Sequence, residues 1–567
     1  MDSFRKSEFK KGISGKTKKR HDNQISLRKE KKEVKLSKRR DYQKPQQNSE
    51  FKTYLDNFNP QALEQGDLKT LKHLKHMISI ANEQEIERHI MRHILPYIPI
   101  LVKYCQTTEP HRLEYVECAM SCLVNLTSTQ QDQNDKLAIA IFKSKFVSET
   151  IPTMLLRFHQ GNNACMSLKV RQGIWDVLSN LALTSKQAVM DIFKSPILNM
   201  GDSKSLFFQE LFLLYNEKLT SDDVRLSLMP YMVYLVRALY GYETYKVPTA
   251  FCVGIWPFLQ KVVQDIQPVS RDEMSPDVIC LCANLYKAIF TLIMTQNEHD
   301  TLQMSRMIIG TDTDSMLTRM LAMMRVTVVG VQLFIVKIIG YIMFIEIGEG
   351  YMQKMMTRTG WDKKMVELAD HNDFEIRQRA LLFLGNFVSD GTPYVLQLIE
   401  YGVIGSVINK LNRERYNIVK YRALYVFLKM FTACDADRRQ CPNERIQKLA
   451  EGIMRTLVVE KSMFNYVLPF ITQAGNDVCI IKDALRILET ALLWDKKLVI
   501  SQINDTGERA LQELMNQINH NKGDKDTALF ELACRVDDLV TDHDMDLETS
   551  NYFEGTNLFQ EGQGFSF

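Results

Sequence analysis

Glycine and proline are scarce in this sequence, with 25 Gly and 15 Pro among 567 residues. Both lie below their usual shares of about 7% and about 5%. A large β-sandwich or another turn-rich fold needs more of both, so the composition favours an all-helical protein. At 45% apolar and 25% charged residues, the chain has the composition of a globular protein and not of a disordered or collagen-like one.

The sequence also lacks the patterns that accompany disulfides, secretion and common catalytic sites. Its eleven cysteines include no C-x-x-C pair, and the charged N-terminus has no apolar segment typical of a signal peptide. We therefore expect a reduced, intracellular protein. No Gly-rich phosphate loop, G-x-S-x-G elbow or H-E-x-x-H helix is present. We expect no enzymatic activity, no cofactor and no small-molecule substrate.

Two patterns resemble metal sites but are weak. His89 and His93 stand four residues apart on a predicted helix without an evident third ligand, so we interpret them as an incidental surface pair. Two cysteine pairs lie in apolar helices without accompanying His, which predicts core thiols: Cys118 with Cys122, and Cys280 with Cys282. We expect no metal site.

The small formal net charge of +3 hides an uneven distribution. Residues 1–40 contain sixteen Lys and Arg and five Asp and Glu, a local net charge of +11. The rest of the chain has 55 basic and 63 acidic residues, a net charge of −8. A basic arm of this kind is attracted to the acidic body or to an acidic partner. Residues 541–567 carry six acids and no Lys or Arg, which predicts a solvated tail.

The basic residues of the arm fall into separated clusters: F-K-K-G at 9–12, K-K-R at 18–20, L-R-K-E-K-K at 27–32 and K-R-R at 38–40. A helix is allowed after residue 25, but too few apolar side chains are present to stabilise it alone. We expect the arm to fold only against an acidic surface. By itself, such an arm is also typical of a solvated tail, a localisation signal or a loose nucleic-acid contact. Within residues 1–40, Phe9 is the single aromatic residue after Phe4. The arm therefore lacks a series of aromatic rings on which nucleic-acid bases could stack, which argues against nucleic-acid binding.

The order and spacing of these clusters resemble the importin-β-binding domain of the importin-α family. The resemblance implies that the arm lies, as a helix with an extended lead, inside the acidic concave surface of importin-β. It also implies that the K-R-R cluster occupies the protein's own cargo groove when importin-β is absent. Carried over by position, the importin-β-binding residues are Lys18, Lys19, Arg20, Arg28, Lys29, Lys31, Lys32, Lys38, Arg39 and Arg40.

Beyond the arm, helical patterns run almost without interruption and contain a recurring unit, an apolar helix with Asn or a small residue near its end. In the clear copies this residue near the helix end is Asn, at positions 125, 180, 284 and 386. Weaker copies of the unit have their equivalent residue at positions 238, 341, 429 and 490. The shorter intervals between copies match the 40–47 residues of HEAT and armadillo repeats. The longer intervals imply inserted loops.

We therefore predict an all-α fold, a right-handed α-solenoid of about ten armadillo-type repeats with a flexible basic N-terminal arm. Importin-α has the same number of repeats, so the resemblance extends over nearly the whole chain. The segment 507–540 resembles the last repeat of that family, which implies the importin-α export receptor as a further partner. The predicted boundaries are 1–45 for the arm, 46–68 for a linker, 69–540 for the solenoid and 541–567 for the acidic tail.

In importin-α the inner helices carry a W-x-x-x-N box. Its Asn bonds to the backbone of an extended cargo peptide, and its Trp stacks on a cargo Lys or Arg. The resemblance assigns cargo binding to Asn125, Asn180, Asn284 and Asn386. The corresponding Trp positions hold Ser121, Asp176, Cys280 and Leu382. Trp175 is one residue out of register, about 100° around the helix, and is predicted to be core.

Two further departures weaken the cargo site. The acid that the family places four residues after the third-repeat Asn is Thr184 here. At the minor site Tyr425 and Lys429 replace Trp and Asn, and a Lys repels basic cargo. Each lost stacking contact weakens binding by about 0.5–2 kcal/mol. An Asn near a helix end often serves only as a local cap. The cargo-binding role of the four Asn residues is therefore a hypothesis.

The resemblance implies an adaptor that links cargo with a nuclear localisation signal to importin-β and shuttles between cytoplasm and nucleus, without binding nucleic acid. The alternative is a scaffold that keeps the importin-β contact but binds a folded partner, or none, in the groove. Residues 326–348 are nearly long and apolar enough to cross a bilayer, and the transmembrane and coiled-coil family also combines such an arm with armadillo repeats. A buried helix is favoured instead, because the segment contains the polar residues Gln332, Lys337 and Glu346 and lies where the buried helix of repeat six is expected.

Overall fold

The computed structural model describes residues 57–80, 95–128, 134–161, 165–199, 205–215, 222–240, 247–266, 276–295, 298–309, 315–326, 328–343, 351–472, 478–503, 509, 512–514 and 527–541. Within these ranges the chain forms helices joined by turns, and no strand is present. The described residues fall into two compact units. The first lies within Thr17–Met304 and Arg325–Val331, and the second within Ser305–Met324 and Gln332–Phe567.

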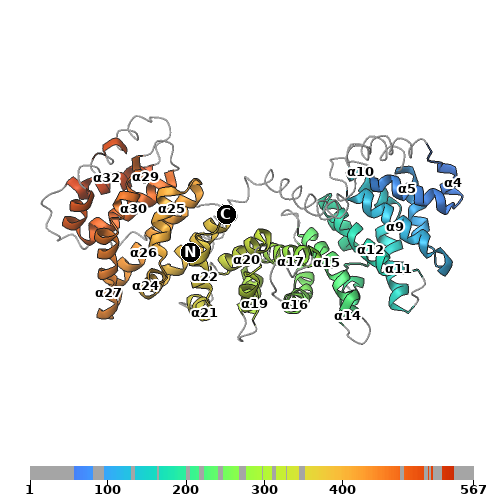
Figure 1. The fold of residues 1–567 in the computed structure, drawn as a ribbon, viewed down its shortest axis with the longest axis horizontal. Coiled ribbons are helices and arrows are strands. Elements are labelled where there is room, and N and C mark those ends of the chain that lie inside the picture. Colours follow the sequence, from blue (N-terminus) through green and yellow to red (C-terminus); the bar gives the residue numbers. More distant parts are fainter. Residues whose placement is uncertain are drawn as a thin grey trace. The chain divides into compact units, whose positions relative to one another are not determined.

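In the first unit five helices form a series in which each contacts the next: α5 (Leu68–Ile80), α9 (Leu113–Thr127), α12 (Leu168–Ala182), α15 (Asp222–Leu239) and α17 (Pro276–Thr295) (Figure 1). The other helices that begin here are α4 (Pro60–Glu64), α8 (Ile98–Cys105), α10 (Asn134–Lys143), α11 (Ile151–His159), α13 (Lys186–Lys194), α14 (Leu206–Tyr215), α16 (Thr249–Asp265) and α18 (Glu298–Ile309). Short helical turns are η2 (Leu95–Tyr97), η3 (Pro110–Arg112) and η4 (Phe146–Thr150).

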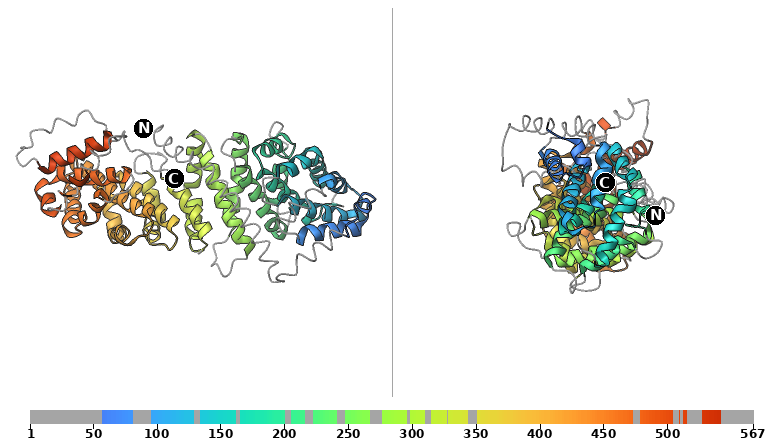
Figure 2. Two further views of the ribbon diagram at one scale, coloured as in Figure 1. Left: turned by 90° about the horizontal axis from the view of Figure 1, so that it is seen from above. Right: turned by 90° about the vertical axis from the view of Figure 1, so that its right-hand side faces the viewer.

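The second unit contains a similar series: α23 (Phe374–Phe387), α26 (Asn417–Gln440), α30 (Val478–Trp494) and α32 (Thr527–Thr541) (Figure 2). Its other helices are α19 (Met316–Met323), α21 (Tyr351–Thr359), α22 (Trp361–Leu368), α24 (Thr392–Glu400), α25 (Val403–Arg413), α27 (Glu444–Arg455), α28 (Phe464–Val467) and α29 (Pro469–Thr472), with the turns η6 (Val388–Asp390) and η7 (Thr456–Glu460). Helix α20 (Val329–Ile342) begins in residues of the first unit and continues in the second.

We call the two series, together with α20, the ladder helices. All eight positions of the predicted repeat unit lie on them: Asn125, Asn180, Ala238, Asn284, Tyr341, Asn386, Lys429 and Thr490. The repeat is clearest where α21, α22 and α23 are followed by α24, α25 and α26. Three helices per repeat is the armadillo arrangement. The prediction of an all-α solenoid is therefore confirmed.

Glycine is required at one equivalent turn of these two repeats. Gly360 separates α21 from α22 with φ +80°, and Gly402 separates α24 from α25 with φ +84°. This left-handed conformation is favourable for glycine and strained for other residues. The sequence thus fixes the sharp turn between the first two helices of each repeat.

The apolar residues of the ladder helices form the core. Trp175 is fully buried, with its ring centroid 5.5 Å from that of Phe207, so its predicted core position is confirmed. Of the predicted core thiols, Cys118, Cys122 and Cys282 are buried and Cys280 is partly exposed.

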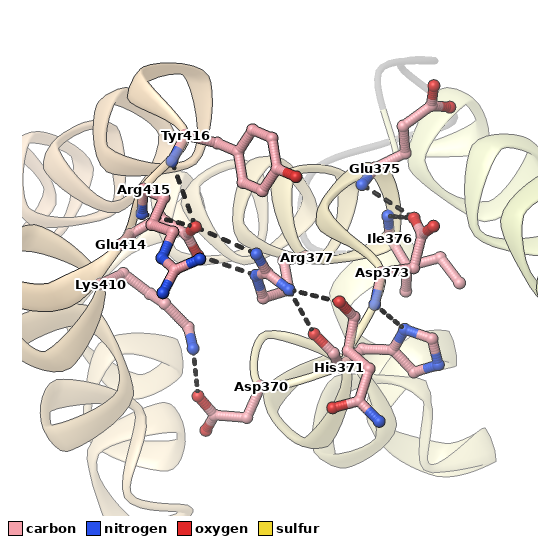
Figure 3. Close-up of polar contacts among 11 residues, drawn as sticks. Asp370, His371, Asp373, Glu375, Ile376, Arg377, Lys410, Glu414, Arg415 and Tyr416 are labelled. Carbon is pink, nitrogen blue, oxygen red and sulfur yellow. Dashed lines mark hydrogen bonds and ion pairs between the residues drawn. The ribbon is translucent and has the colours of Figure 1, made fainter.

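One largely buried ion pair joins the first turn of α23 to the loop that precedes α26 (Figure 3). Arg377 donates to both carboxylate oxygens of Glu414, at 2.9 and 3.0 Å. Its third nitrogen donates to the carbonyls of His371 and Asn372, both at 2.8 Å. The pair therefore ties the start of one ladder helix to the loop before the next.

The helical chain starts earlier than predicted. Helix α4 lies within the range expected to be linker, and its Leu63 is fully buried, with a carbonyl that accepts a hydrogen bond from the Tyr104 hydroxyl. The predicted arm, the pair His89 and His93, and the acidic residues after Thr541 lie outside the described residues. In the part of the chain that the structure describes, no helix is both long and apolar enough to span a bilayer; α20 has 14 residues.

Candidate peptide groove

A hollow of about 310 Å³ lies on the ladder helices of the first unit. Helices α5, α9, α12 and α15 all contribute to it, so it runs across successive repeats. Its lining residues are Lys75, Ser79, Met120, Ser121, Val124, Asn125, Lys169, Gln172, Gly173, Asp176 and Tyr231. Hydroxyl, amide and charged groups make it a polar groove rather than an apolar pocket.

The close approach of α9 and α12 shapes this groove. A Cβ atom on Gly173 would lie 2.3 Å from Cγ of Met120, which is closer than a side chain tolerates. The missing side chain therefore allows Met120 to lie against α12. The cap of α12 is also well defined, because the Ser167 hydroxyl accepts from the Val170 amide at 3.4 Å and donates to Glu117 at 2.7 Å.

Asn125 is the sequence-predicted cargo residue that lies in the groove. It is partly exposed on α9, one turn after Ser121, at the position expected for peptide contact. Ser121 donates to the Glu117 carbonyl at 2.8 Å, and Asp176 is only 2% exposed. Neither side chain offers the flat ring that stacks on a Lys or Arg stem.

Asn180 and Asn284 instead lie inside the protein, each only 5% exposed. The Asn180 amide donates to the Thr127 hydroxyl at 3.1 Å and therefore links α12 to α9. The Asn284 amide donates to the Cys280 carbonyl at 2.9 Å, and its oxygen accepts from Arg237 of α15. Both side chains therefore link neighbouring ladder helices inside the protein, and in this conformation neither is exposed for contact with a peptide.

In the second unit Asn386 is partly exposed but engaged. The Tyr425 hydroxyl donates to its oxygen at 2.9 Å, and the Tyr425 ring lies against Gly385, where a Cβ would be 2.5 Å from a ring carbon. The ammonium of Lys429 is 5.5 Å from the centre of that ring. Leu382, at the Trp position, is 4% exposed and belongs to the core.

Basic side chains lie beside the acidic ones at the groove of the first unit. In the first unit Lys169 and Lys75 line the groove, and Lys169 is 4.0 Å from Glu117. At the position of the expected acid, Thr184 donates to the Leu181 carbonyl at 2.7 Å. The groove thus holds basic side chains beside its few carboxylates.

In the second unit the half-buried Lys337 on α20 and Arg379 on α23 and the buried Arg422 on α26 act on one another electrostatically in sequence. Burial, and next the charge of Arg379, lower the pKa of Lys337 to about 8. Burial and the neighbouring Arg422 lower the pKa of Arg379 to about 10, and burial lowers that of Arg422 to about 10 as well. These positive side chains would repel a basic ligand that bound next to them.

Sequence reasoning found the ladder positions but missed the residues that decide their exposure. Gly173 and Gly385 permit the close contacts, and Arg237 occupies the oxygen of Asn284. A glycine within an apolar helix was the available signal for the first two. None of the predicted importin-β-binding residues lies in the described chain, and no group of three His, Cys, Asp or Glu that could hold a metal occurs within it.

Comparisons with known proteins agree with both parts of the chain. Residues 5–91 match the family model described as "Importin beta binding domain". An engineered protein of known structure is 14% identical, with a TM-score of 0.57 over 86% of this chain and 98% of that chain. The designed armadillo repeat protein YIII(Dq)4CqI is 16% identical over 50% of this chain and 99% of that chain, with a TM-score of 0.36. No curated protein matches the sequence.

The match at 5–91 covers every basic cluster of the arm, and the structure supplies the helical repeats that follow it. An importin beta binding domain joined to an α-solenoid is the organisation that the sequence resemblance implied. The chain thus combines a segment that matches the importin beta binding domain with an all-α solenoid of armadillo type.

Proposed function

We propose that this protein is a nuclear import adaptor, which links a cargo segment to importin-β and shuttles between cytoplasm and nucleus. The observation that carries the proposal is the polar groove across α5, α9, α12 and α15, joined in one chain to an importin beta binding domain. An extended peptide has unpaired backbone groups, and the partly exposed amide of Asn125 can bond to them. The amide nitrogen of Gln172 already donates to the Ser227 carbonyl at 3.2 Å. The arm supplies the second contact, with importin-β.

The groove supports weak recognition of basic signals. Carboxylates of Glu117 and Asp176 lie at or beside it, but Lys75 and Lys169 lie there too. A localisation signal rich in Lys and Arg therefore gains little electrostatic attraction, and its stems find no Trp to stack on. We propose that cargo binds through its backbone in the first unit, with localisation-signal residues contributing less than in the family.

The groove proposal is tested by fluorescence anisotropy with a labelled peptide of five consecutive Lys and Arg residues. The full chain is used with Lys38, Arg39 and Arg40 replaced by Ala, which removes competition from the arm. We expect Asn125→Ala to weaken binding about threefold to tenfold, because one or two peptide hydrogen bonds are lost. The control is Asn412→Ala, an exposed Asn on α25. Equal affinity of the two variants contradicts the proposal.

A scaffold that no longer recognises basic signals is the second candidate, and the burial of Asn180 and Asn284 favours it. The two candidates differ in one result: the scaffold binds importin-β but not the basic peptide. Charge reversal at Arg28, Lys31 and Arg39 tests the shared activity and is expected to abolish capture by importin-β. The matched variant reverses three exposed or half-buried Lys of the body, at 420, 448 and 461. It should retain capture.

The export receptor is proposed as a further partner on the basis of the resemblance at 507–540. Helix α32 lies in this segment, and its Arg535 pairs with Glu489 of α30 at 2.9 Å. The last ladder helix is thus held against its neighbour and presents a folded end. Loss of export-receptor binding after Arg535→Glu, with importin-β capture unchanged, is the expected result.

A further inference from the structure

One ammonium at the groove of the first unit takes part in no ion pair among the described residues. It belongs to Lys75, which is half-buried on α5 and lines the groove. The neighbouring lysines differ, because Lys72, one turn earlier, is 2.6 Å from Glu114 of α9, and Lys169 of α12 is 4.0 Å from Glu117. Lys75 is therefore the lysine of the groove whose charge is left for a ligand.

The carboxylates near this ammonium are already engaged. Asp176, which also lines the groove, is only 2% exposed and interacts within the protein. Glu117 accepts a hydrogen bond of 2.7 Å from the Ser167 hydroxyl in addition to its 4.0 Å contact with a lysine. Burial raises the pKa of the Cys118 thiol on α9 and the charge of Lys75 acts to lower it, so the ammonium lies beside this neutral thiol. A carboxylate of a ligand can thus approach it without displacing an existing partner.

The polar groups in the same groove favour an extended ligand. Asn125 is partly exposed there, and within the described chain its side chain forms no hydrogen bond. The Ser121 hydroxyl, one turn earlier on α9, donates to the Glu117 carbonyl at 2.8 Å, which leaves its oxygen as an acceptor. A carboxamide can bond to both the N–H and the C=O of a peptide. The groove therefore offers backbone contacts next to a single free positive charge.

We infer that the groove takes an extended segment with an acidic side chain, whose carboxylate pairs with Lys75 while its backbone bonds to Asn125. The inference rests on the proposed function, because it names the charge of the cargo at the same groove. Residues 41–567 have a formal net charge of −8, which by itself attracts basic peptides. A preference for an acidic peptide must therefore come from the groove and not from the general charge of the body.

The first test titrates three labelled twelve-residue Gly/Ser peptides, in which the two central residues are Glu, Gln or Lys. The full chain is used with Lys38, Arg39 and Arg40 replaced by Ala, at about 0.15 M salt, where distant charges are screened. We expect the Glu peptide to bind about threefold tighter than the Gln peptide, as for a partly exposed ion pair, and the Lys peptide to bind most weakly.

Charge reversal at the groove should reverse this order. Lys75→Glu should make the Lys peptide bind most tightly, a result that damage to the fold cannot produce. Lys186→Glu is the matched control, because it makes the same charge change at an exposed residue of α13 outside the groove. Equal effects of the two variants on the order of the peptides overturn the inference.

Asn125→Ala separates this inference from the proposed function. It should weaken all three peptides by a similar factor, because the backbone contact does not depend on their charge. Binding that needs Asn125 but ignores the charge of the peptide, or that favours Lys, overturns the inference and leaves the groove proposal standing. Absence of binding, or binding that is unchanged by Asn125→Ala, overturns both.

Carbodiimide cross-linking locates the contact independently. The Glu peptide should be joined to Lys75, as shown by mass spectrometry of the digested chain. Lys75→Arg should remove this cross-link but keep the preference for the Glu peptide, because a guanidinium retains the positive charge. Cross-links confined to the lysines of residues 1–40 overturn the inference.

Discussion

Removing the guanidinium of Arg377 should loosen two neighbouring repeats of the second unit. This side chain is 11% exposed and its partner Glu414 is 6% exposed, so the pair is shielded from solvent. Arg377→Met keeps the apolar stem of the side chain but removes four hydrogen bonds, two to the carboxylate and two to the carbonyls of His371 and Asn372 (Figure 3). The Glu414 charge is then left buried.

The expected cost follows from that burial. Removing one partner of a buried ion pair costs about 3–5 kcal/mol, because the remaining charge is uncompensated. Glu414 still accepts from the amides of Arg415 at 2.9 Å and Tyr416 at 3.2 Å, which favours the lower end, about 3 kcal/mol. Lys364 and Glu367 form a 2.8 Å pair whose side chains are 30% and 55% exposed. That pair is worth about 0–1 kcal/mol, so Lys364→Met is the matched control.

Native-state hydrogen exchange is the suitable assay, because a long repeat array does not unfold in one two-state step. Since every 1.4 kcal/mol is a factor of ten, a loss of about 3 kcal/mol predicts roughly 100-fold faster exchange at the start of α23 and α26. Lys364→Met should change it less than about fivefold. Adding Glu414→Gln to Arg377→Met should recover part of the protection. A change below tenfold for Arg377→Met refutes the idea that this pair clamps the repeats.

Three other predictions follow from burial and close approach. Gly173→Ala should lower the melting temperature, at a cost of about 1–3 kcal/mol from overpacking, whereas Gly405→Ala, where a Cβ meets nothing within 4 Å, should raise it slightly. The pKa of Lys337 is about 8 in the folded chain against 10.5 ordinarily, so the folded state loses this proton first; thermal stability should rise between pH 8 and 10, and Lys337→Met should remove that rise. Burial raises the pKa of Cys105 to about 12, so iodoacetamide at pH 8 should alkylate the half-buried Cys441 much faster, as followed by mass spectrometry.

The solenoid could be predicted from sequence because its packing imposes a local pattern. Apolar helices that carry Asn or a small residue near their end recur along the chain, and a small residue allows a neighbouring helix to approach closely. Gly173 under Met120 and Gly385 under Tyr425 are two such contacts. Recurrence of small residues in apolar helices is visible without any knowledge of partners. The burial of Trp175 was likewise predictable, since one residue out of register turns a side chain by about 100°.

The exposure of the four ladder asparagines could not be predicted in the same way. Asn125 and Asn180 occupy the same place in their helices, yet one lies in the groove and the other bonds to Thr127, 53 residues earlier. The fate of Asn284 depends on Arg237 of the preceding ladder helix. Helical periodicity fixes the face of a single helix, but not how far the neighbouring helix covers that face. Burial at a ladder position is a property of two repeats.

Lys429 decides how well the second unit accepts a basic peptide. Its partly exposed ammonium is 5.5 Å from the centre of the Tyr425 ring, at the position where the resemblance to importin-α places an Asn, so it repels a Lys- and Arg-rich peptide. A Lys429→Glu change should therefore strengthen binding of the basic peptide in the anisotropy titration. Lys448→Glu makes the same charge change at an exposed residue of α27 and measures the general electrostatic effect. An equal gain for the two variants would mean that the position of the charge on α26 is unimportant, whereas a gain at residue 429 alone identifies this position as a point of peptide contact.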